Sequence, residues 1–167
     1  LPVLPRPGLR PTPDRVRETL FNWLGQSLDG WRCADVFAGT GALGLEAASR
    51  GAAEVVLCEQ DRSLAQQLQQ HVQRLQATQV RVQPGDGLVW LQQQSASWDL
   101  IFLDPPFGAD LFLPALRAAA QAVRGEGRIY LEAPELWDEA VLQPLGLQTV
   151  RHLKAGGVHA HVLQPIA

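Results

Sequence analysis

The sequence contains no methionine, one tyrosine and only two cysteines. Two cysteines are too few for a disulfide framework, and both Cys33 and Cys58 lie in or beside an expected strand. We therefore interpret them as reduced core residues and expect a cytoplasmic protein. No apolar run is long enough to span a membrane, so no membrane partner is expected. Because the chain begins with Leu1 and lacks Met, we expect the start of the natural protein to be missing.

Several catalytic and metal-binding patterns are also missing. No lysine follows the glycine-rich segment, which excludes a nucleoside-triphosphate P-loop, and no Gly-x-Ser-x-Gly supports a hydrolase. The four histidines are scattered and no Cys/His group has zinc spacing, so we expect no metal site. The formal net charge of −3 does not by itself indicate a nucleic-acid binder.

What is present is a regular alternation of apolar strands with amphipathic helices over 167 residues, which predicts one domain spanning residues 1–167. Residues 1–11 carry four prolines and indicate an extended arm. The expected strands cover residues 32–37, 54–58, 80–83, 98–103 and 128–133, followed by a closing antiparallel pair at 147–153 and 158–164. The sequence therefore predicts an α/β fold with a doubly wound, mostly parallel seven-stranded sheet and an antiparallel C-terminal hairpin.

A glycine-rich segment follows the first expected strand. It reads Gly39-Thr40-Gly41-Ala42-Leu43-Gly44, which is G-x-G-x-x-G at a strand-to-helix junction. Glycines there permit a tight turn and a close approach of the backbone to a ligand. The spacing fits dinucleotide-binding and other nucleoside-binding proteins alike.

Three carboxylates end strands near these glycines. Glu59 lies where an acid would accept hydrogen bonds from a ribose diol, or it is a surface acid at a strand end. Asp86 could reach an adenine amino group or stabilise its own Gly-Asp-Gly turn. Asp35 could order the glycine segment by accepting its N–H groups, or contact the amino end of a cofactor. Asp61 is more simply a helix cap.

The most specific signal is Asp104-Pro105-Pro106-Phe107, which ends the strand at residues 98–103. Two prolines forbid continuation of the strand and fix a rigid turn. The Asp104 carboxylate and the Pro105 carbonyl can accept the two hydrogens of an exocyclic amine on a planar base. Phe107 can stack on that base. The other interpretation is a strand-ending turn with a core phenylalanine.

These segments together resemble a known family. Residues 35–47 and 104–107 look like S-adenosylmethionine-dependent amino-methyltransferases. The run Arg10-Pro11-Thr12-Pro13-Asp14-Arg15-Val16-Arg17-Glu18-Thr19-Leu20-Phe21-Asn22-Trp23-Leu24 is similar to the opening of the RsmD-like enzymes, which methylate the N2 amine of a guanine in bacterial 16S ribosomal RNA. The similarity covers nearly the whole chain and implies a class I, Rossmann-like methyltransferase.

The resemblance also implies roles for individual residues. It makes residues 35–41, with Asp35, Phe37, Ala38, Gly39 and Gly41, the loop around the methionine part of the cofactor. It assigns the ribose to Glu59, the adenine to Asp86 and the target base to residues 104–107. It lets Thr12 and Arg15 close over the amino-acid end of the cofactor. The family usually has a short basic hairpin before the arm, and this chain begins inside or after it.

Basic residues gather at the start of the chain. Arg6, Arg10 and Arg17, beside Arg15, could contact RNA phosphates or form a solvated arm. The partner that the resemblance implies is 16S ribosomal RNA, free or in an assembling small ribosomal subunit, and a monomer is the working expectation.

The sequence therefore predicts methyl transfer from S-adenosylmethionine to a guanine N2 by direct in-line displacement. An adenine-N6 or cytosine-N4 nucleic-acid methyltransferase would use the same crevice. An NAD-dependent oxidoreductase is compatible with the glycine spacing alone, and a non-catalytic RNA-binding module with a vestigial pocket is the fourth hypothesis.

Overall fold

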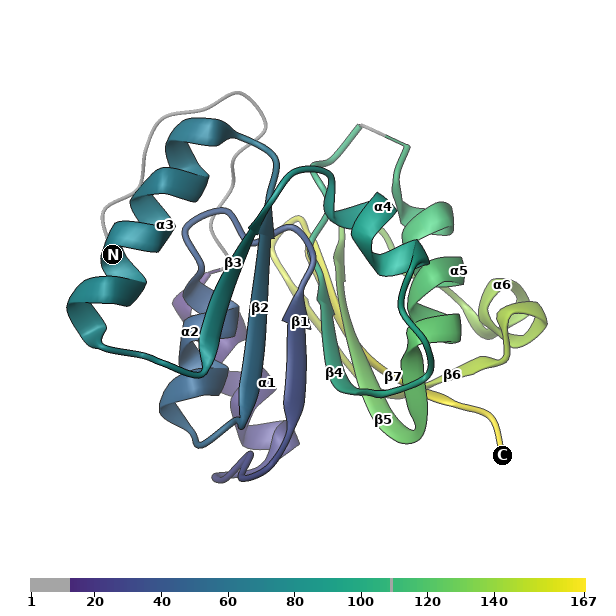
Figure 1. The fold of residues 1–167 in the computed structure, drawn as a ribbon. Helices are drawn as coiled ribbons and strands as arrows, with labels where there is room; N and C mark the ends of the chain where they lie inside the picture. The colour runs from purple at the N-terminus through teal and green to yellow at the C-terminus, as the bar shows by residue number, and fades with distance from the viewer. Residues whose placement is uncertain (1–12, 109) are drawn as a thin grey trace.

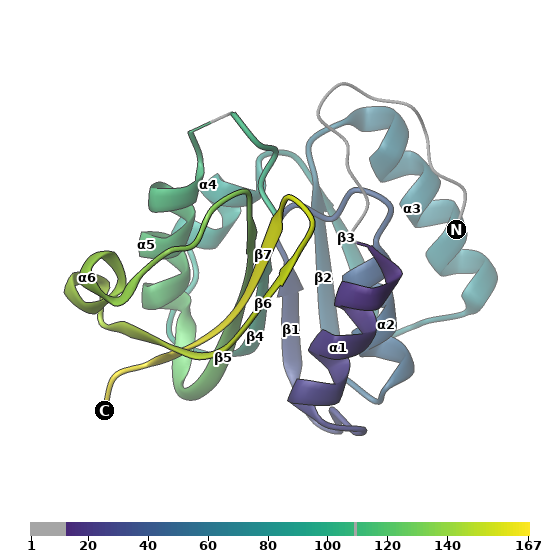
Figure 2. The same ribbon diagram turned by 180° about the vertical axis from the view of Figure 1, so that it is seen from behind.

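The computed structural model describes residues 13–108 and 110–167. It consists of one seven-stranded sheet with helices on both faces, shown from opposite sides in Figures 1 and 2. The strands are β1 (Arg32–Asp35), β2 (Glu54–Glu59), β3 (Val80–Pro84), β4 (Trp98–Leu103), β5 (Val123–Ala133), β6 (Leu147–Ala155) and β7 (Val158–Pro165). The helices are α1 (Asp14–Leu24), α2 (Ala42–Ser49), α3 (Arg62–Leu75), α4 (Gly87–Gln92), α5 (Phe112–Ala122) and α6 (Glu139–Leu142), with a 3-10 turn, η1 (Gln143–Leu145).

The strand order is β3-β2-β1-β4-β5-β7-β6. Strands β1 to β5 pair in parallel, whereas β7 is antiparallel to both of its neighbours, β5 and β6. The order reverses between β1 and β4, because the chain builds outward from β1 to β3 and then returns to the other side. The predicted fold class, including the antiparallel C-terminal hairpin, is confirmed.

Both faces of the central sheet are buried, and β4 shows how its sequence achieves this. Leu100 and Phe102 pack on one face with α1 and α2, while Ile101 and Leu103 pack on the other face with α4 and α5. A strand covered on both faces needs apolar residues at every position rather than at alternate ones. This requirement explains the continuous apolar run that made β4 predictable, and its predicted bounds are those of the structure.

Other boundaries differ from the prediction. The first strand ends at Asp35 rather than at residue 37, so Val36 and Phe37 belong to the turn that follows. The fifth strand begins at Val123 rather than at residue 128, so Gly125 and Gly127 lie within it. Gly127 is required there because an added Cβ would lie 2.9 Å from the Trp98 carbonyl oxygen. It marks a close backbone approach, not a turn.

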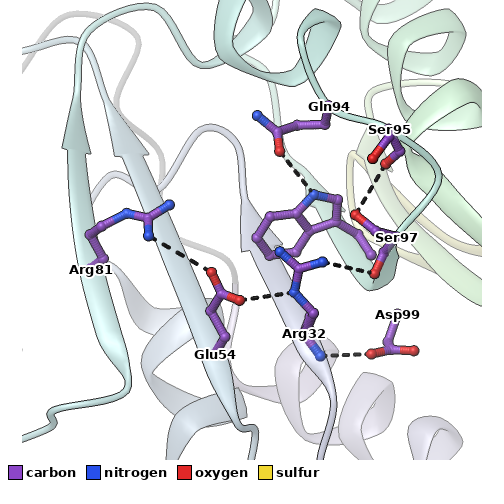
Figure 3. A network of polar contacts seen from close by, with 8 residues as sticks. Arg32, Glu54, Arg81, Gln94, Ser95, Ser97 and Asp99 are labelled. Carbon is purple, nitrogen blue, oxygen red and sulfur yellow. Dashed lines mark hydrogen bonds and ion pairs between the residues drawn. The ribbon is translucent and has the colours of Figure 1, made fainter.

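A polar network ties together the amino ends of three strands, at the edge of the sheet opposite the strand ends that carry the predicted site (Figure 3). Arg32 opens β1; its Nε donates to Glu54 Oε1 at 2.8 Å, and its backbone N–H donates to Asp99 Oδ2 at 2.7 Å. The guanidinium carbon lies 4.3 Å from the ring centroid of Trp98, whose Nε1 donates to Gln94. This cluster fixes β1, β2 and β4 in register and so positions their far ends.

Candidate active site

The carboxyl ends of β1, β2, β3 and β4 lie along one edge of the sheet, at the top in Figure 1. The glycine turn follows β1, Glu59 ends β2, Asp86 follows β3, and Asp104 follows β4. Since β1 and β4 are adjacent at the point where the strand order reverses, this edge is where open α/β sheets bind their ligands.

The glycine turn is held by backbone bonds to its neighbouring strands. The Ala38 N–H donates to the Cys58 carbonyl at 2.9 Å, and the Gly41 N–H donates to the Ala38 carbonyl at 2.8 Å. Gly39 and Gly41 have φ of 58° and 81°, values that glycine adopts without strain. At Gly41 an added Cβ would also lie 2.7 Å from Leu68 Cδ2. The two glycines are therefore needed for the shape of the turn.

Asp35 is buried beneath this turn, with 2% of its surface exposed. Its Oδ2 accepts a hydrogen bond of 3.0 Å from the Gly44 N–H in the first turn of α2. Burial raises the pKa of Asp35 to about 7, against the lowering effect of the Gly44 N–H, and the charge of Glu59 raises it further. Of the two predicted alternatives, the structure shows the ordering role; the predicted contact with a cofactor stays a prediction.

Glu59 anchors the turn from the neighbouring strand. Its Oε1 accepts from the Gly39 N–H at 2.9 Å, and its Oε2 accepts from the Asp61 N–H at 2.8 Å. Burial raises the pKa of this carboxyl, and the two N–H donors act in the opposite direction. Each carboxylate oxygen has a second lone pair, so the predicted ribose contact remains chemically open. Asp61 caps α3 as expected, accepting from Ser63 and Leu64.

Asp86 caps α4. Its Oδ1 accepts from the backbone N–H groups of Leu88 at 2.9 Å and Val89 at 3.3 Å. The structure thus shows the local stabilising role, which was the alternative to adenine binding. Next to it, Gly87 packs so closely that an added Cβ would lie 2.0 Å from the Val36 carbonyl oxygen. That contact presses the start of α4 against the turn after β1 and keeps Asp86 at the same edge.

Residues 104–107 leave β4 as an extended segment that ends in a turn. Pro105 is buried, whereas Asp104 and Phe107 are half-buried. The Phe107 ring lies 6.1 Å from the ring of Phe112, in the first turn of α5. The sequence motif is therefore placed beside the glycine turn, with its aromatic ring supported from α5.

A second aromatic support was not found from the sequence. The Trp137 ring lies 6.0 Å from that of Phe112, and its backbone N–H donates to His161 Nε2 at 3.1 Å. The other imidazole nitrogen, Nδ1, bonds to the Leu131 carbonyl at 3.1 Å. Burial lowers the pKa of His161 to about 4, so the ring is neutral and accepts from Trp137. The loop after β5 and the first turn of α5 thus support residues 104–107. No local sequence pattern indicates that these two segments lie together.

Two of the predicted basic site residues, Arg15 and Arg17, lie on α1. Arg15 is exposed in the first turn of α1, and Arg17 forms an ion pair of 2.8 Å with Asp14. The predicted sites Thr12, Arg6 and Arg10 lie outside the described residues. The cofactor contacts of Thr12 and Arg15 and the RNA contacts of Arg6, Arg10 and Arg17 stay predictions.

Within the described parts of the chain, no group of three or more His, Cys, Asp or Glu side chains could hold a metal ion. No described helix is long and apolar enough to cross a membrane.

The carboxylates of Glu59 and Asp35 accept hydrogen bonds from the N–H groups of Gly39 and Gly44, so these N–H groups are already engaged. The turn therefore favours a cationic ligand over a phosphate.

The family model described as "Conserved hypothetical protein 95" matches residues 1–164. The chain belongs to this family. A relative in Escherichia coli (strain K12), named ribosomal RNA small subunit methyltransferase D, is 50% identical over 107 residues, which are 64% of this chain and 54% of that protein. The protein of the same name from Haemophilus influenzae is 36% identical over 170 residues, 98% of this chain and 87% of that protein.

The match to the E. coli relative thus spans about half of its length. A solved structure described as a putative methyltransferase, yhhF, from E. coli superposes with a TM-score of 0.84 at 36% identity, covering 95% of this chain and 89% of that one. The resemblance to the RsmD-like family, drawn from the residues, is confirmed by the family match and the named relatives.

Proposed function

We propose that this protein transfers a methyl group from S-adenosylmethionine to the exocyclic N2 amine of a guanine in 16S ribosomal RNA. The observation that carries the proposal is the pair of carboxylates bonded to the N–H groups of Gly39 and Gly44, at the same end of the paired strands β1 and β4 as Asp104-Pro105. The relatives named ribosomal RNA small subunit methyltransferase D supply the RNA class. The partner is then 16S ribosomal RNA or an assembling small subunit, which works in the cytoplasm.

The residues present fit this cofactor by charge. S-adenosylmethionine supplies an electrophilic methyl group on a sulfonium and carries a second positive charge on its ammonium. Glu59 and the ionised form of Asp35 make the turn electronegative; Asp35 is buried and Glu59 is half-buried. A dinucleotide would instead bring a pyrophosphate against the same two acids, with the Gly39 and Gly44 N–H groups already engaged. The NAD-dependent oxidoreductase is disfavoured on that ground.

The target amine is positioned by the segment after β4. The lone pair of an exocyclic amine is delocalised into the base and is a poor nucleophile. The Asp104 carboxylate and the Pro105 carbonyl accept its two hydrogens, which favours a pyramidal nitrogen. Phe107, backed by Phe112, stacks on the base after it leaves its own stack. Positioning and charge placement then provide most of the catalysis, without a metal.

The experiment is methyl transfer to undermethylated small ribosomal subunits, with the modified nucleoside identified by mass analysis. N2-methylguanosine in 16S RNA is the expected product. N6-methyladenosine or N4-methylcytidine would instead support the alternative methyltransferases. Calorimetry with S-adenosylhomocysteine and with NAD addresses the rest: NAD binding would revive the oxidoreductase, and no nucleoside binding would favour the non-catalytic module.

The Asp104→Ala variant separates the role of the segment after β4 from the role of the glycine turn. We expect this variant to bind S-adenosylhomocysteine with wild-type affinity and to lose at least about 100-fold in kcat, because it removes an acceptor for the amine and leaves the turn intact. Simultaneous loss of cofactor binding would contradict this division of labour. Asp86→Asn, which keeps an oxygen to cap α4, is the matched control at the end of β3.

A further inference from the structure

Two segments of more than 20 residues in this acidic protein have no acidic residue, residues 62–85 and residues 140–167, and the first of them lies beside the candidate site. Between Asp61 and Asp86, residues 62–85 contain three arginines, one histidine and eight glutamines but none of the 17 aspartates and glutamates. This segment forms α3 and the edge strand β3. In Figure 1, α3 lies outermost at the β3 side of the sheet. A solvated helix face ordinarily mixes both charge signs, so glutamine with arginine alone is unusual.

Within residues 13–108 and 110–167, the arginines of α3 have no ion-pair partner. Arg62 and Arg74 are exposed, and neither forms an ion pair or a side-chain hydrogen bond with any residue in the described ranges. Gln70 is also exposed, and His71 is half-buried. Among the residues that the structure describes, nothing engages the two arginines, which is a condition for an interaction surface.

A pocket of about 300 Å³ connects this face to the candidate active site. Its polar wall combines the glycine turn with one side of α3: Gly39, Thr40, Gln67, Gln70, His71 and Arg74. Gly39 is the residue whose N–H binds Glu59. The pocket therefore adjoins the turn that we assign to the cofactor, and a chain lying along α3 would run directly to the crevice.

The chemistry of this wall selects a polyanion. Arginine, histidine and amide side chains donate hydrogen bonds to phosphate and ribose oxygens, and α3 itself carries no carboxylate. The Glu59 carboxylate next to Gly39 already accepts from the N–H groups of Gly39 and Asp61. The sequence as a whole carries a net charge of −3, so an RNA strand must be held by a local region without acidic residues.

We propose that the exposed face of α3 and this pocket bind the RNA backbone flanking the target nucleotide, with a phosphate seated between Arg74 and Gln70. This inference rests on the proposed function for the identity of the RNA. It adds the surface that directs the strand into the crevice.

Two substitutions test it with little effect on the fold. Gln70→Glu is isosteric, keeps a similar helix propensity and places one negative charge at the pocket. Arg74→Gln removes one positive charge. The matched controls are Gln121→Glu and Arg117→Gln on α5, both exposed and on the opposite face of the sheet.

Each variant is compared with the wild type in three measurements: affinity for S-adenosylhomocysteine, kcat and KM on undermethylated small subunits, and binding of 16S RNA as a function of salt. Gln70→Glu should raise KM and the RNA dissociation constant about threefold or more at low salt. Arg74→Gln should reduce the slope of log affinity against log salt by about 0.7 to 0.9. Cofactor affinity and kcat should stay within about twofold of wild type.

The outcomes separate the two proposals. If the wild type methylates guanine but the α3 variants behave like the α5 controls, the α3 surface is wrong and the proposed function stands. If the wild type binds RNA through α3 but methylates no guanine, the proposed function fails. Wild-type protein that does not bind RNA at all, or a Gln121→Glu variant as impaired as Gln70→Glu, overturns the inference.

Discussion

Replacement of Asp35 by asparagine should change how stability depends on pH. Asp35 is 2% exposed, and its Oδ2 accepts a hydrogen bond from the Gly44 N–H. In the unfolded chain its pKa is near 3.8, whereas burial raises its pKa to about 7 in the folded protein. Between these values the folded state holds a proton that the unfolded state has lost.

The sign and size follow from this difference. Stability rises with pH only where the unfolded state binds more protons, and here it binds fewer. The contribution of Asp35 is therefore fully present below pH 3.8 and is lost as pH rises to about 7. With 1.36 kcal/mol for each pH unit, the shift from 3.8 to about 7 corresponds to a loss of about 4 kcal/mol. That is a large share of the total stability of an ordinary domain.

The assay is urea unfolding of wild-type protein and the Asp35→Asn variant from pH 4 to pH 8.5. Asparagine keeps an oxygen to accept from Gly44 and cannot ionise. The difference between the two stability profiles cancels other titrating groups, such as Glu59 and His161. It should grow in favour of the variant by up to about 4 kcal/mol toward pH 7 and then stay constant. A difference that does not change across this range would refute the reasoning.

The same carboxyl links stability to the cofactor. A cation bound at the turn favours the ionised form, so cofactor binding below pH 7 should release a proton from Asp35. Calorimetric titrations of S-adenosylhomocysteine, which retains the ammonium, in two buffers of different ionisation enthalpy measure that release. The release should vanish in Asp35→Asn, which should also bind the cofactor less tightly. Equal proton release in both proteins would assign it to another group.

Two further substitutions test the scaffold. Gly87→Ala should lower the stability by about 2 kcal/mol or more in urea unfolding, because its Cβ would lie 2.0 Å from the Val36 carbonyl oxygen, whereas Gly125→Ala meets nothing within 4 Å and should have little effect. Arg32→Met should lower stability by about 1 kcal/mol, since Arg32 and Glu54 are partly exposed; a double-mutant cycle with Glu54→Gln that gives a coupling well above 1 kcal/mol would contradict this.

The sheet was predictable because its central strands are buried on both faces. The apolar run at residues 100–103 has no alternation to misread, and Asp104 and two prolines follow it. The error at β5 has a specific cause. Gly125 and Gly127 have the local signature of a turn, but Gly127 is a glycine because the Trp98 carbonyl and the Val123 side chain leave no room for a Cβ. Only the pairing of β4 with β5 reveals that constraint.

The sequence indicated which residues lie at the same end of the sheet. It did not indicate which of their atoms form hydrogen bonds. The carboxyl ends of parallel strands lie at one end of the sheet, so Glu59, Asp86 and Asp104 had to lie at that same end. Whether Asp86 caps α4 or faces a ligand depends on its side-chain orientation, which sequence spacing does not determine. The support of Phe107 by Phe112 and Trp137 joins the segment after β4, the first turn of α5 and the loop after β5. No local sequence pattern indicates that these segments meet.

The glycine turn separates two regions of opposite electrostatic character. On its inner side, Asp35 and Glu59 bind the N–H groups of Gly44 and Gly39 and favour a cation. On its outer side, Gly39 lines the pocket of α3, where arginine and amide donors favour a phosphate. A small cationic cofactor and a polyanionic substrate can therefore approach the same backbone segment without competing for the same charges. Because exposed contacts are screened by salt and buried ones much less, RNA affinity should fall steeply between 50 and about 200 mM salt while cofactor affinity changes little. Parallel loss of both affinities with salt would mean that the two ligands share one electrostatic site.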